Sequence, residues 1–126
     1  MTVAHAVLWL DHRLAELHPL DADAPARRLH AHSHPTAQHH ADVRDQHEFF
    51  AAVCASLDDV AQALLAGGHQ ATADFMRYVR KHRPAVEARI AGCEIVDHPS
   101  ERELLALGRG HFDRLARGLA PAATDR

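Results

Sequence analysis

Apolar runs separated by glycine and proline divide the second half of the chain into alternating strands and helices. An apolar run over 60–66 stops at two glycines, and apolar residues then recur at helical spacing over 71–82 until Pro84 ends the pattern. A second apolar run covers 90–96. Two strands joined by a helix normally lie parallel in one sheet and need cover on both faces. This half of the chain therefore predicts an α/β fold.

The first third of the chain predicts an antiparallel meander of three strands. Residues 5–10 are almost continuously apolar, which is typical of a central strand. Residues 11–13 form a turn, and residues 14–18 alternate like a half-exposed return strand. Residues 27–32 then form the third strand. The chain therefore begins with a ribbon that the later strands extend into one sheet.

Two capping patterns mark the starts of helices. Asp45 with Glu48 is expected to cap the helix after the third strand, and Ser100 with Glu103 to form a capping box at the start of the last helix. Apolar residues share one side of each helix: Phe49, Phe50, Val53, Cys54 and Leu57 in the first, and Leu104, Leu105, His111, Phe112 and Leu115 in the last. The predicted order is βββ-α-β-α-β-α, with helices on both faces of the sheet.

Length and composition indicate one packed domain. The chain has 126 residues, of which 47% are hydrophobic, and this supports a core rather than disorder. We expect a single α/β domain over residues 1–118. It includes a mobile, histidine-rich loop at 33–43 that lacks apolar periodicity, and a frayed C-terminal tail follows at 119–126.

The charge balance argues against a broadly basic nucleic-acid-binding protein and draws attention to histidine. The 14 basic and 17 acidic residues leave no bulk positive charge. The 13 histidines are unusual, because protonating all of them would move the formal charge from −3 to +10. Surface charge should therefore depend strongly on mild acidification.

Cysteine usage and the absence of targeting signals predict the cellular location. Cys54 and Cys93 form no CxxC pair, so we expect reduced core thiols, one in a helix and one in a buried strand. No signal peptide and no membrane-spanning stretch are recognisable. We therefore expect a soluble, cytoplasmic protein with no membrane partner.

Three segments carry a resemblance to a known family. They are Ala6-Val-Leu-Trp-Leu-Asp-His-Arg13, Leu65-Ala-Gly-Gly68 and Asp97-His-Pro-Ser100. The pattern resembles the small bacterial proteins often labelled "translational machinery protein", which are related to the middle domain of the archaeal and eukaryotic class-1 peptide release factor and of pelota. The resemblance covers roughly residues 4–117 and implies a ribonuclease H-like fold with a mixed five-stranded sheet.

One departure from the family pattern bears on function. The release factor's middle domain carries a Gly-Gly-Gln tip on the loop between its third strand and the following helix, whereas here that loop, residues 33–42, contains no glycine. The segment Gly67-Gly68-His69-Gln70 is no substitute, because it follows the fourth strand. Peptidyl-tRNA hydrolysis is therefore not expected. The resemblance implies a non-enzymatic, translation-associated protein that binds RNA or a ribosomal partner.

The densest group of basic residues lies at and after the end of the second predicted helix. It comprises Arg77, Arg80, Lys81, Arg83 and Arg89. Cations at this end of a helix complement the macrodipole, which accounts for them without a ligand. On the functional interpretation they contact RNA phosphates, with Tyr78 as the one aromatic residue in the group that could stack on a base.

Six histidines form an alternative candidate site. They are His30, His32, His34, His39, His40 and His47. The first three alternate and would share one face of an extended chain, and neutral imidazoles are good ligands for zinc, nickel or copper. No fixed zinc-motif spacing is met. The two interpretations are a histidine-dependent metal-binding or pH-responsive protein and a set of solvated loop histidines, and no other cofactor is implied.

Acidic residues allow a third interpretation, a magnesium-dependent nuclease of ribonuclease H type. The carboxylates of Asp11, Glu48, Asp59 and Asp97 would have to converge on paired metal ions. Turn and capping roles explain all four without catalysis. Gly67-Gly68 could likewise meet a phosphate, although a tight strand-to-helix turn is the simpler account. An exposed edge strand is compatible with a homodimer, but nothing in the sequence selects one.

Overall fold

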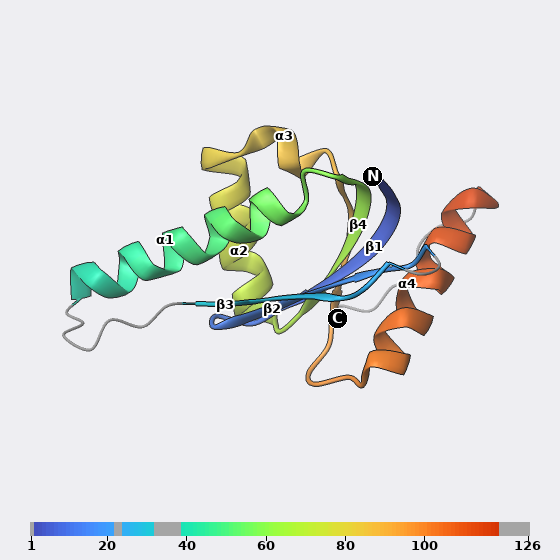
Figure 1. Cartoon of the computed structure of the whole chain (residues 1–126), viewed down its shortest axis with the longest axis horizontal. Helices are drawn as coiled ribbons and strands as arrows, with labels where there is room; N and C mark the ends of the chain where they lie inside the picture. The colour runs from blue at the N-terminus through green and yellow to red at the C-terminus, as the bar shows by residue number, and fades with distance from the viewer. Residues whose placement is uncertain (1, 22–23, 32–38, 119–126) are drawn as a thin grey trace.

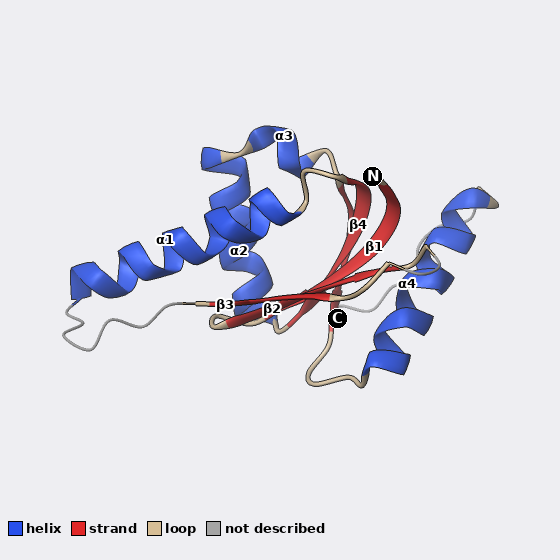
Figure 2. Ribbon diagram, viewed as in Figure 1, coloured by secondary structure: helices blue, strands red, loops and turns tan. Residues whose placement is uncertain are grey.

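Five strands form one mixed sheet in the computed structural model, which describes residues 2–21, 24–31 and 39–118. They are β1 (Val3–Leu10), β2 (Leu14–Pro19), β3 (Arg27–His30), β4 (Val60–Gly67) and β5 (Ile90–Ile95). The strand order is β3-β2-β1-β4-β5. β2 is antiparallel to both β1 and β3, whereas β4 is parallel to both β1 and β5. The antiparallel ribbon and the parallel half therefore meet at β1 (Figures 1 and 2).

Helices cover both faces of this sheet. α1 (His39–Ser56), α2 (His69–His82) and the short α3 (Pro84–Glu87) lie on one face, and α4 (Glu101–Ala116) lies on the other (Figure 1). The predicted α/β class, mixed five-stranded sheet and element order are confirmed, and α3 is an additional turn of helix that begins at Pro84. None of the helices in the described part of the chain is long and apolar enough to cross a membrane.

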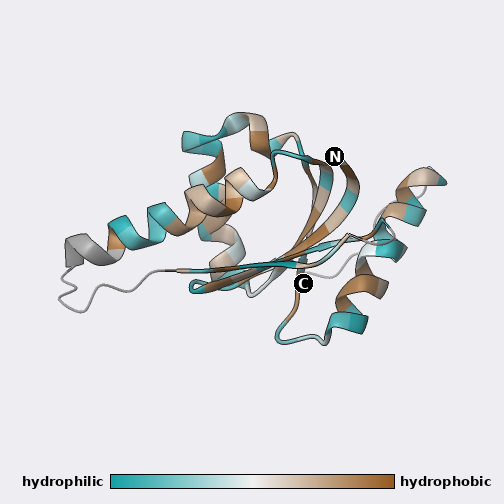
Figure 3. Ribbon diagram, viewed as in Figure 1, coloured by the Kyte–Doolittle hydropathy of each residue, from teal (hydrophilic) through white to brown (hydrophobic). Residues whose placement is uncertain are grey.

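β1 is buried on both faces and separates two apolar cores. Ala6, Leu8 and Leu10 belong to the larger core under α1 and α2, while Val7 and Trp9 belong to the smaller core under α4. This division follows because successive side chains of a strand point to opposite faces. Figure 3 shows a largely hydrophobic centre of the sheet between helices of mixed character.

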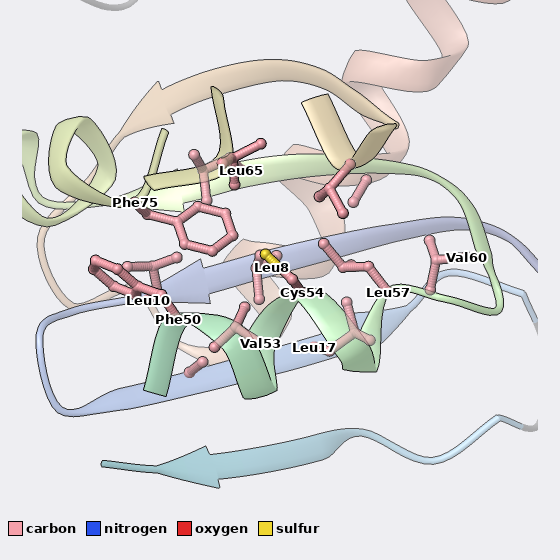
Figure 4. Packing of buried hydrophobic residues seen from close by; sticks show 14 of the residues in the cluster. Leu8, Leu10, Leu17, Phe50, Val53, Cys54, Leu57, Val60, Leu65 and Phe75 are labelled. Carbon is pink, nitrogen blue, oxygen red and sulfur yellow. The ribbon is translucent and has the colours of Figure 1, made fainter. Parts of the chain in front are cut away.

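α1 and α2 each place an apolar stripe in the larger core. The predicted stripe of α1 is buried throughout: Phe49, Phe50, Val53, Cys54 and Leu57. Several of these side chains face the sheet beside Leu8 and Leu17 (Figure 4), and Phe50 meets Phe75 of α2 edge-on, with ring centroids 5.4 Å apart. Cys54 is buried and free, so it is the core thiol that the sequence predicts, and its burial raises the pKa of the thiol to about 11.

The start of α1 corrects the sequence prediction. The predicted cap formed by Asp45 with Glu48 is wrong, because both residues lie inside α1, which begins at His39. Residues 39–43 of the predicted loop are therefore helical, and residues 33–38 lie outside the described part of the chain, as does the predicted tail at 119–126. The N-terminal half of α1 projects beyond the sheet (Figure 1), and such a segment lacks the apolar periodicity on which the prediction relied.

α4 confirms the predicted capping box. Ser100 Oγ accepts a hydrogen bond from the backbone N–H of Glu103 at 3.1 Å, and Glu103 Oε1 accepts one from the backbone N–H of Ser100 at 2.8 Å. The predicted apolar side is only partly correct, because Leu104, His111 and Phe112 are buried whereas Leu115 is 38% exposed. The last turn of α4 therefore extends past the sheet.

Gly108 brings α4 close to β1. A Cβ atom at this position would lie 2.2 Å from Cγ2 of Val7, so a side chain there would push the helix off the strand. Close approach of the α4 backbone to β1 brings the helix into van der Waals contact with the smaller core.

β5 corrects the prediction of a buried strand. It forms one edge of the sheet, so it has a neighbouring strand on one side alone. Cys93 in its centre is exposed, and the prediction that both cysteines are core thiols is wrong for this residue. Apolar composition identified the strand but could not show that it lies at an edge.

The turn from β4 into α2 depends on Gly67. Its φ is +150°, and a Cβ atom there would lie 2.3 Å from the carbonyl oxygen of Leu10 on the neighbouring strand. Gly68, the N-cap of α2, has φ −70°, and a Cβ atom at this position would meet nothing within 4 Å. The two adjacent glycines therefore have different roles, and Gly67 is the one that permits a tight turn.

Replacing each glycine by alanine should separate these roles. Gly67→Ala should lower the free energy of unfolding by roughly 2 kcal/mol or more, because the new methyl group must displace the backbone of β1. Gly68→Ala, the matched control, should lower it by at most about 1 kcal/mol, the typical cost of placing alanine at an N-cap. Urea unfolding measures both, and equal effects of the two substitutions would contradict the close approach at Gly67.

Candidate functional site

A groove of about 360 Å³ lies between α1 and α2. Its residues recur at three- and four-residue spacing, which places them on one side of each helix. From α1 they are Val43, Gln46, His47 and Phe50, and from α2 they are Asp74, Arg77, Tyr78, Lys81 and His82. The volume lies near the lower end of the roughly 300–1,000 Å³ found for small-molecule sites.

Four rings meet at the centre of the groove. The ring centroid of Tyr78 lies 4.7 Å from that of His82, 5.4 Å from that of His47 and 5.7 Å from that of Phe50. His47 and His82 lie 5.5 Å apart, and both are exposed, whereas Phe50 is buried. Phe50 therefore forms an apolar floor beneath three rings that solvent or a ligand can reach.

Exposed cations line the groove and the end of α2. Arg77 donates a hydrogen bond to Asp74 Oδ1 at 3.1 Å, and Arg80 donates one to Glu87 at 2.9 Å. Lys81 and Arg83 are exposed and form no ion pair with any residue that the structure describes. Four of the five basic residues singled out in the sequence are therefore exposed on α2 or directly after it, and two of them, Arg77 and Lys81, border the groove.

The fifth basic residue, Arg89, is used inside the fold. Its Nη1 donates to the backbone carbonyls of Leu57, Asp58 and Val60 at 2.8, 2.9 and 2.9 Å. These carbonyls lie where α1 ends and β4 begins. The guanidinium group thus joins the start of β5 to the turn before β4, and this role accounts for Arg89 without a ligand.

The hairpin turn between β1 and β2 reaches both walls of the groove. His12 Nε2 lies 2.8 Å from Asp74 Oδ2 on α2, and the carbonyl oxygen of His12 accepts a hydrogen bond from Gln46 Nε2 on α1 at 3.2 Å. The bond to His12, with further contributions from Gln70 and Arg77, lowers the pKa of the Asp74 carboxyl below its ordinary value. His12 therefore ties the two helices to one turn of the sheet.

The predicted histidine site is only partly within the described residues. His32 and His34 lie outside the described residues, and the side chains of His39 and His40 are not described. His30 is exposed on the edge strand β3, while His47 packs against Tyr78 and His82 in the groove. In the part of the chain that the structure describes, no three His, Cys, Asp or Glu residues are arranged to hold a metal ion. The metal site stays a prediction.

The four carboxylates of the nuclease interpretation have separate surroundings. Asp11 Oδ1 accepts hydrogen bonds from the backbone N–H groups of Arg13 and Leu14, as expected for a turn residue. Asp59 forms a two-pronged ion pair with Arg27, which lowers its carboxyl pKa. Glu48 and Asp97 are exposed, on α1 and in the segment before α4. These four carboxylates do not come together in a two-metal centre.

Sequence reasoning missed the residues that join the elements of the groove. His12 was assigned only to a turn, and Gln46 and Asp74 carried no motif. The one available signal was the spacing of Gln70, Asp74 and Arg77, which suits side-chain pairing along a helix. Their contact with His12 spans 62 positions in the chain, and no local pattern reports such a contact.

Comparison with known proteins identifies the fold. The sequence matches no protein-family model and no curated protein. The crystal structure of Archaeoglobus fulgidus Pelota is similar, with a TM-score of 0.60 and 16% identity over 93% of this chain. This chain folds like a domain of Pelota. It spans 36% of the Pelota chain, so the likeness is to one part of that protein.

The Pelota likeness confirms one part of the resemblance seen in the sequence. The α/β fold and its mixed sheet are shared with a Pelota domain, as expected. At this identity the similarity concerns the fold alone. Kinship with the bacterial proteins labelled "translational machinery protein" stays a prediction.

The Asp74 contact should make stability depend on pH. Its carboxyl pKa is lowered by folding, so the ionised form stabilises the protein above the ordinary value near 3.8, and this contribution is lost as the pH falls through the lowered pKa. Asp74→Asn should reduce the free energy of unfolding at pH 7 by up to about 1 kcal/mol, a modest value because the group is partly exposed. The difference from wild type should shrink toward pH ~3.

Urea unfolding at several pH values measures this effect. Asp113→Asn is the matched control, because Asp113 forms an exposed ion pair with Arg117 on α4. This substitution removes one negative charge without changing the contact between His12 and Asp74. A difference between Asp74→Asn and wild type that stays constant down to pH ~3 would contradict the assigned pairing.

The structural role of Arg89 can be tested beside an exposed arginine. Arg89→Met should lower the free energy of unfolding by about 1–3 kcal/mol, because three backbone carbonyls lose a charged donor. Arg83→Met should change it by less than about 0.5 kcal/mol, as is usual for a surface substitution. Thermal and urea unfolding report both values, and an Arg89→Met protein as stable as wild type would rule out the assigned role.

Proposed function

We propose that this chain is a non-enzymatic, translation-associated protein that binds RNA through the groove between α1 and α2 and the cations beside it. One observation carries the proposal: Arg77 and Lys81 border the groove that contains the aromatic rings, and Arg80 and Arg83 are exposed in the last turn of α2 and directly after it. Cations that neutralise phosphates and rings that stack on bases are the two recurring parts of RNA-binding surfaces.

The distribution of charge supports a local rather than a general attraction. The whole chain has a formal charge of −3, so its net charge does not favour binding to nucleic acid. Arg77 and Arg80 are partly neutralised by acidic partners, whereas Lys81 and Arg83 are not. Phosphate binding therefore depends most on the last turn of α2 and the residue that follows it.

The likeness to a Pelota domain supports the translation part of the proposal. The sequence resemblance points to proteins related to translation factors, and the fold agrees with it. Such a protein would act in the cytoplasm, on ribosomal RNA or on RNA that the ribosome holds. Arg89 is excluded from the proposed contact set, because its guanidinium group is occupied within the fold.

Co-sedimentation with ribosomes across a salt series tests the proposal. The wild-type protein should associate at low salt and dissociate as salt rises, because phosphate contacts release counterions. Lys81→Gln combined with Arg83→Gln should weaken association and reduce the slope of log K against log salt by roughly 1.4, the value for two lost contacts to single-stranded RNA.

Arg102→Gln combined with Arg114→Gln is the matched control. Both arginines are exposed on α4, on the opposite face of the sheet, and the double variant loses the same charge. It should bind like wild type. No association of the wild-type protein at low salt, or equal loss in the two double variants, would overturn the proposal.

A further inference from the structure

We infer that the groove between α1 and α2 holds one unpaired nucleotide of RNA, with its base against the rings of His47, Tyr78 and His82 and its phosphate on Arg77 and Lys81. This inference rests on the proposed function and specifies its ligand. It differs from general phosphate attraction because it assigns a place to a base.

The size of the groove and its apolar floor favour the binding of a single base. Its volume of about 360 Å³ suits a ligand of nucleotide size rather than a helical stretch of RNA. Phe50 forms the buried floor, and Val43 at the rim is 59% exposed, which is unusual for a large apolar side chain in this protein. An apolar lining with a few polar groups around it is the general architecture of small-molecule sites.

Two of the three rings, His47 and His82, are exposed to solvent, and Tyr78 is partly exposed. Tyr78 and His82 are tilted by 36° with centroids 4.7 Å apart, and His47 closes the group from α1. His47 and His82 are exposed, so neither ring is needed to fill the core. A base that enters the groove can extend this ring group, and stacking of this kind tolerates any base.

Two cations of the groove can contact the phosphate of the nucleotide whose base lies on the rings. Arg77 and Lys81 are four residues apart on α2, so both side chains border the same wall and can reach one phosphate; Lys81 is the stronger contributor, because Arg77 also pairs with Asp74 in the groove. Gln46 donates through Nε2 to His12, which leaves its amide oxygen as an acceptor for a base amino group. The groove therefore combines rings that can stack on a base, two cations and a hydrogen-bond acceptor.

A paired base cannot use this arrangement. In an RNA helix the base faces are stacked on their neighbours, so recognition there depends on shape and on the sugar-phosphate backbone. The groove lies between two helices and admits a base that has left its stack. Single-stranded RNA is therefore the expected ligand, and duplex RNA of the same sequence is the comparison.

The test measures binding of the full chain to a fluorescein-labelled single-stranded RNA of mixed sequence and to its duplex. His47→Ala combined with His82→Ala removes two exposed rings, and His30→Ala combined with His98→Ala removes two exposed histidines elsewhere. The groove variant should bind the single strand about tenfold more weakly than wild type, with an unchanged salt slope, because stacking rather than charge is lost. The control should bind like wild type, and the duplex should bind more weakly than the single strand.

Each other outcome is decisive. Equal binding of single-stranded and duplex RNA, or a groove variant that binds like wild type, would overturn the nucleotide site while leaving phosphate-based RNA binding in place. Ribosome association without any binding to the oligonucleotide would overturn the nucleotide site and indicate a protein partner. Absence of both would remove the proposed function together with the inference. Circular dichroism of the variants shows that they fold.

Discussion

β1 is buried on both faces of the sheet, and both apolar cores of the protein form against it. Its side chains alternate between a core under α1 and α2 and a core under α4, so the strand must lie inside the sheet. Burying side chains such as Leu8 and Leu10 contributes about 1.5–3 kcal/mol each. Because β1 pairs with β2 on one side and β4 on the other, it also joins the antiparallel ribbon to the parallel crossover units.

The register of β1 with β4 decides where the groove forms. Leu10 is paired with Gly67, so the hairpin turn after β1 lies beside the turn that leads into α2. His12 on that turn can therefore reach Asp74 on α2, while its carbonyl oxygen accepts from Gln46 on α1. The two walls of the groove are held by a single turn of the sheet, which gives the ring cluster between them a defined geometry.

Basic and aromatic side chains are concentrated at the groove between α1 and α2, in a chain whose formal net charge is −3. Basic residues near the end of α2 complement the helix dipole, which explains why a helix would carry them there. The dipole does not explain why Tyr78 and His82 share that turn, nor why His47 of another helix packs against them. The combination of cations and rings is what distinguishes this surface from an ordinary helix end.

Local patterns determined most of the fold. The continuous apolar run of β1, the stripe of α1, the glycines before α2 and the capping box of α4 depend on neighbouring residues and on burial, and the sequence records both. The same reasoning failed at the start of α1 and at Cys93. The first turns of α1 project beyond the sheet and carry no apolar stripe. The edge strand β5 has the apolar composition of a central strand, so its position could not be predicted.

The order of the elements, and which residues are basic, aromatic or apolar, can be read from the amino-acid sequence. Which of these residues meet depends on the tertiary structure. There His47 packs beside Tyr78, His12 contacts Asp74, and Arg89 donates hydrogen bonds to backbone carbonyls of the fold. The physical reason is distance along the chain. Secondary structure follows from interactions within a few residues, whereas a site between two helices depends on strand order and register, which no short segment contains.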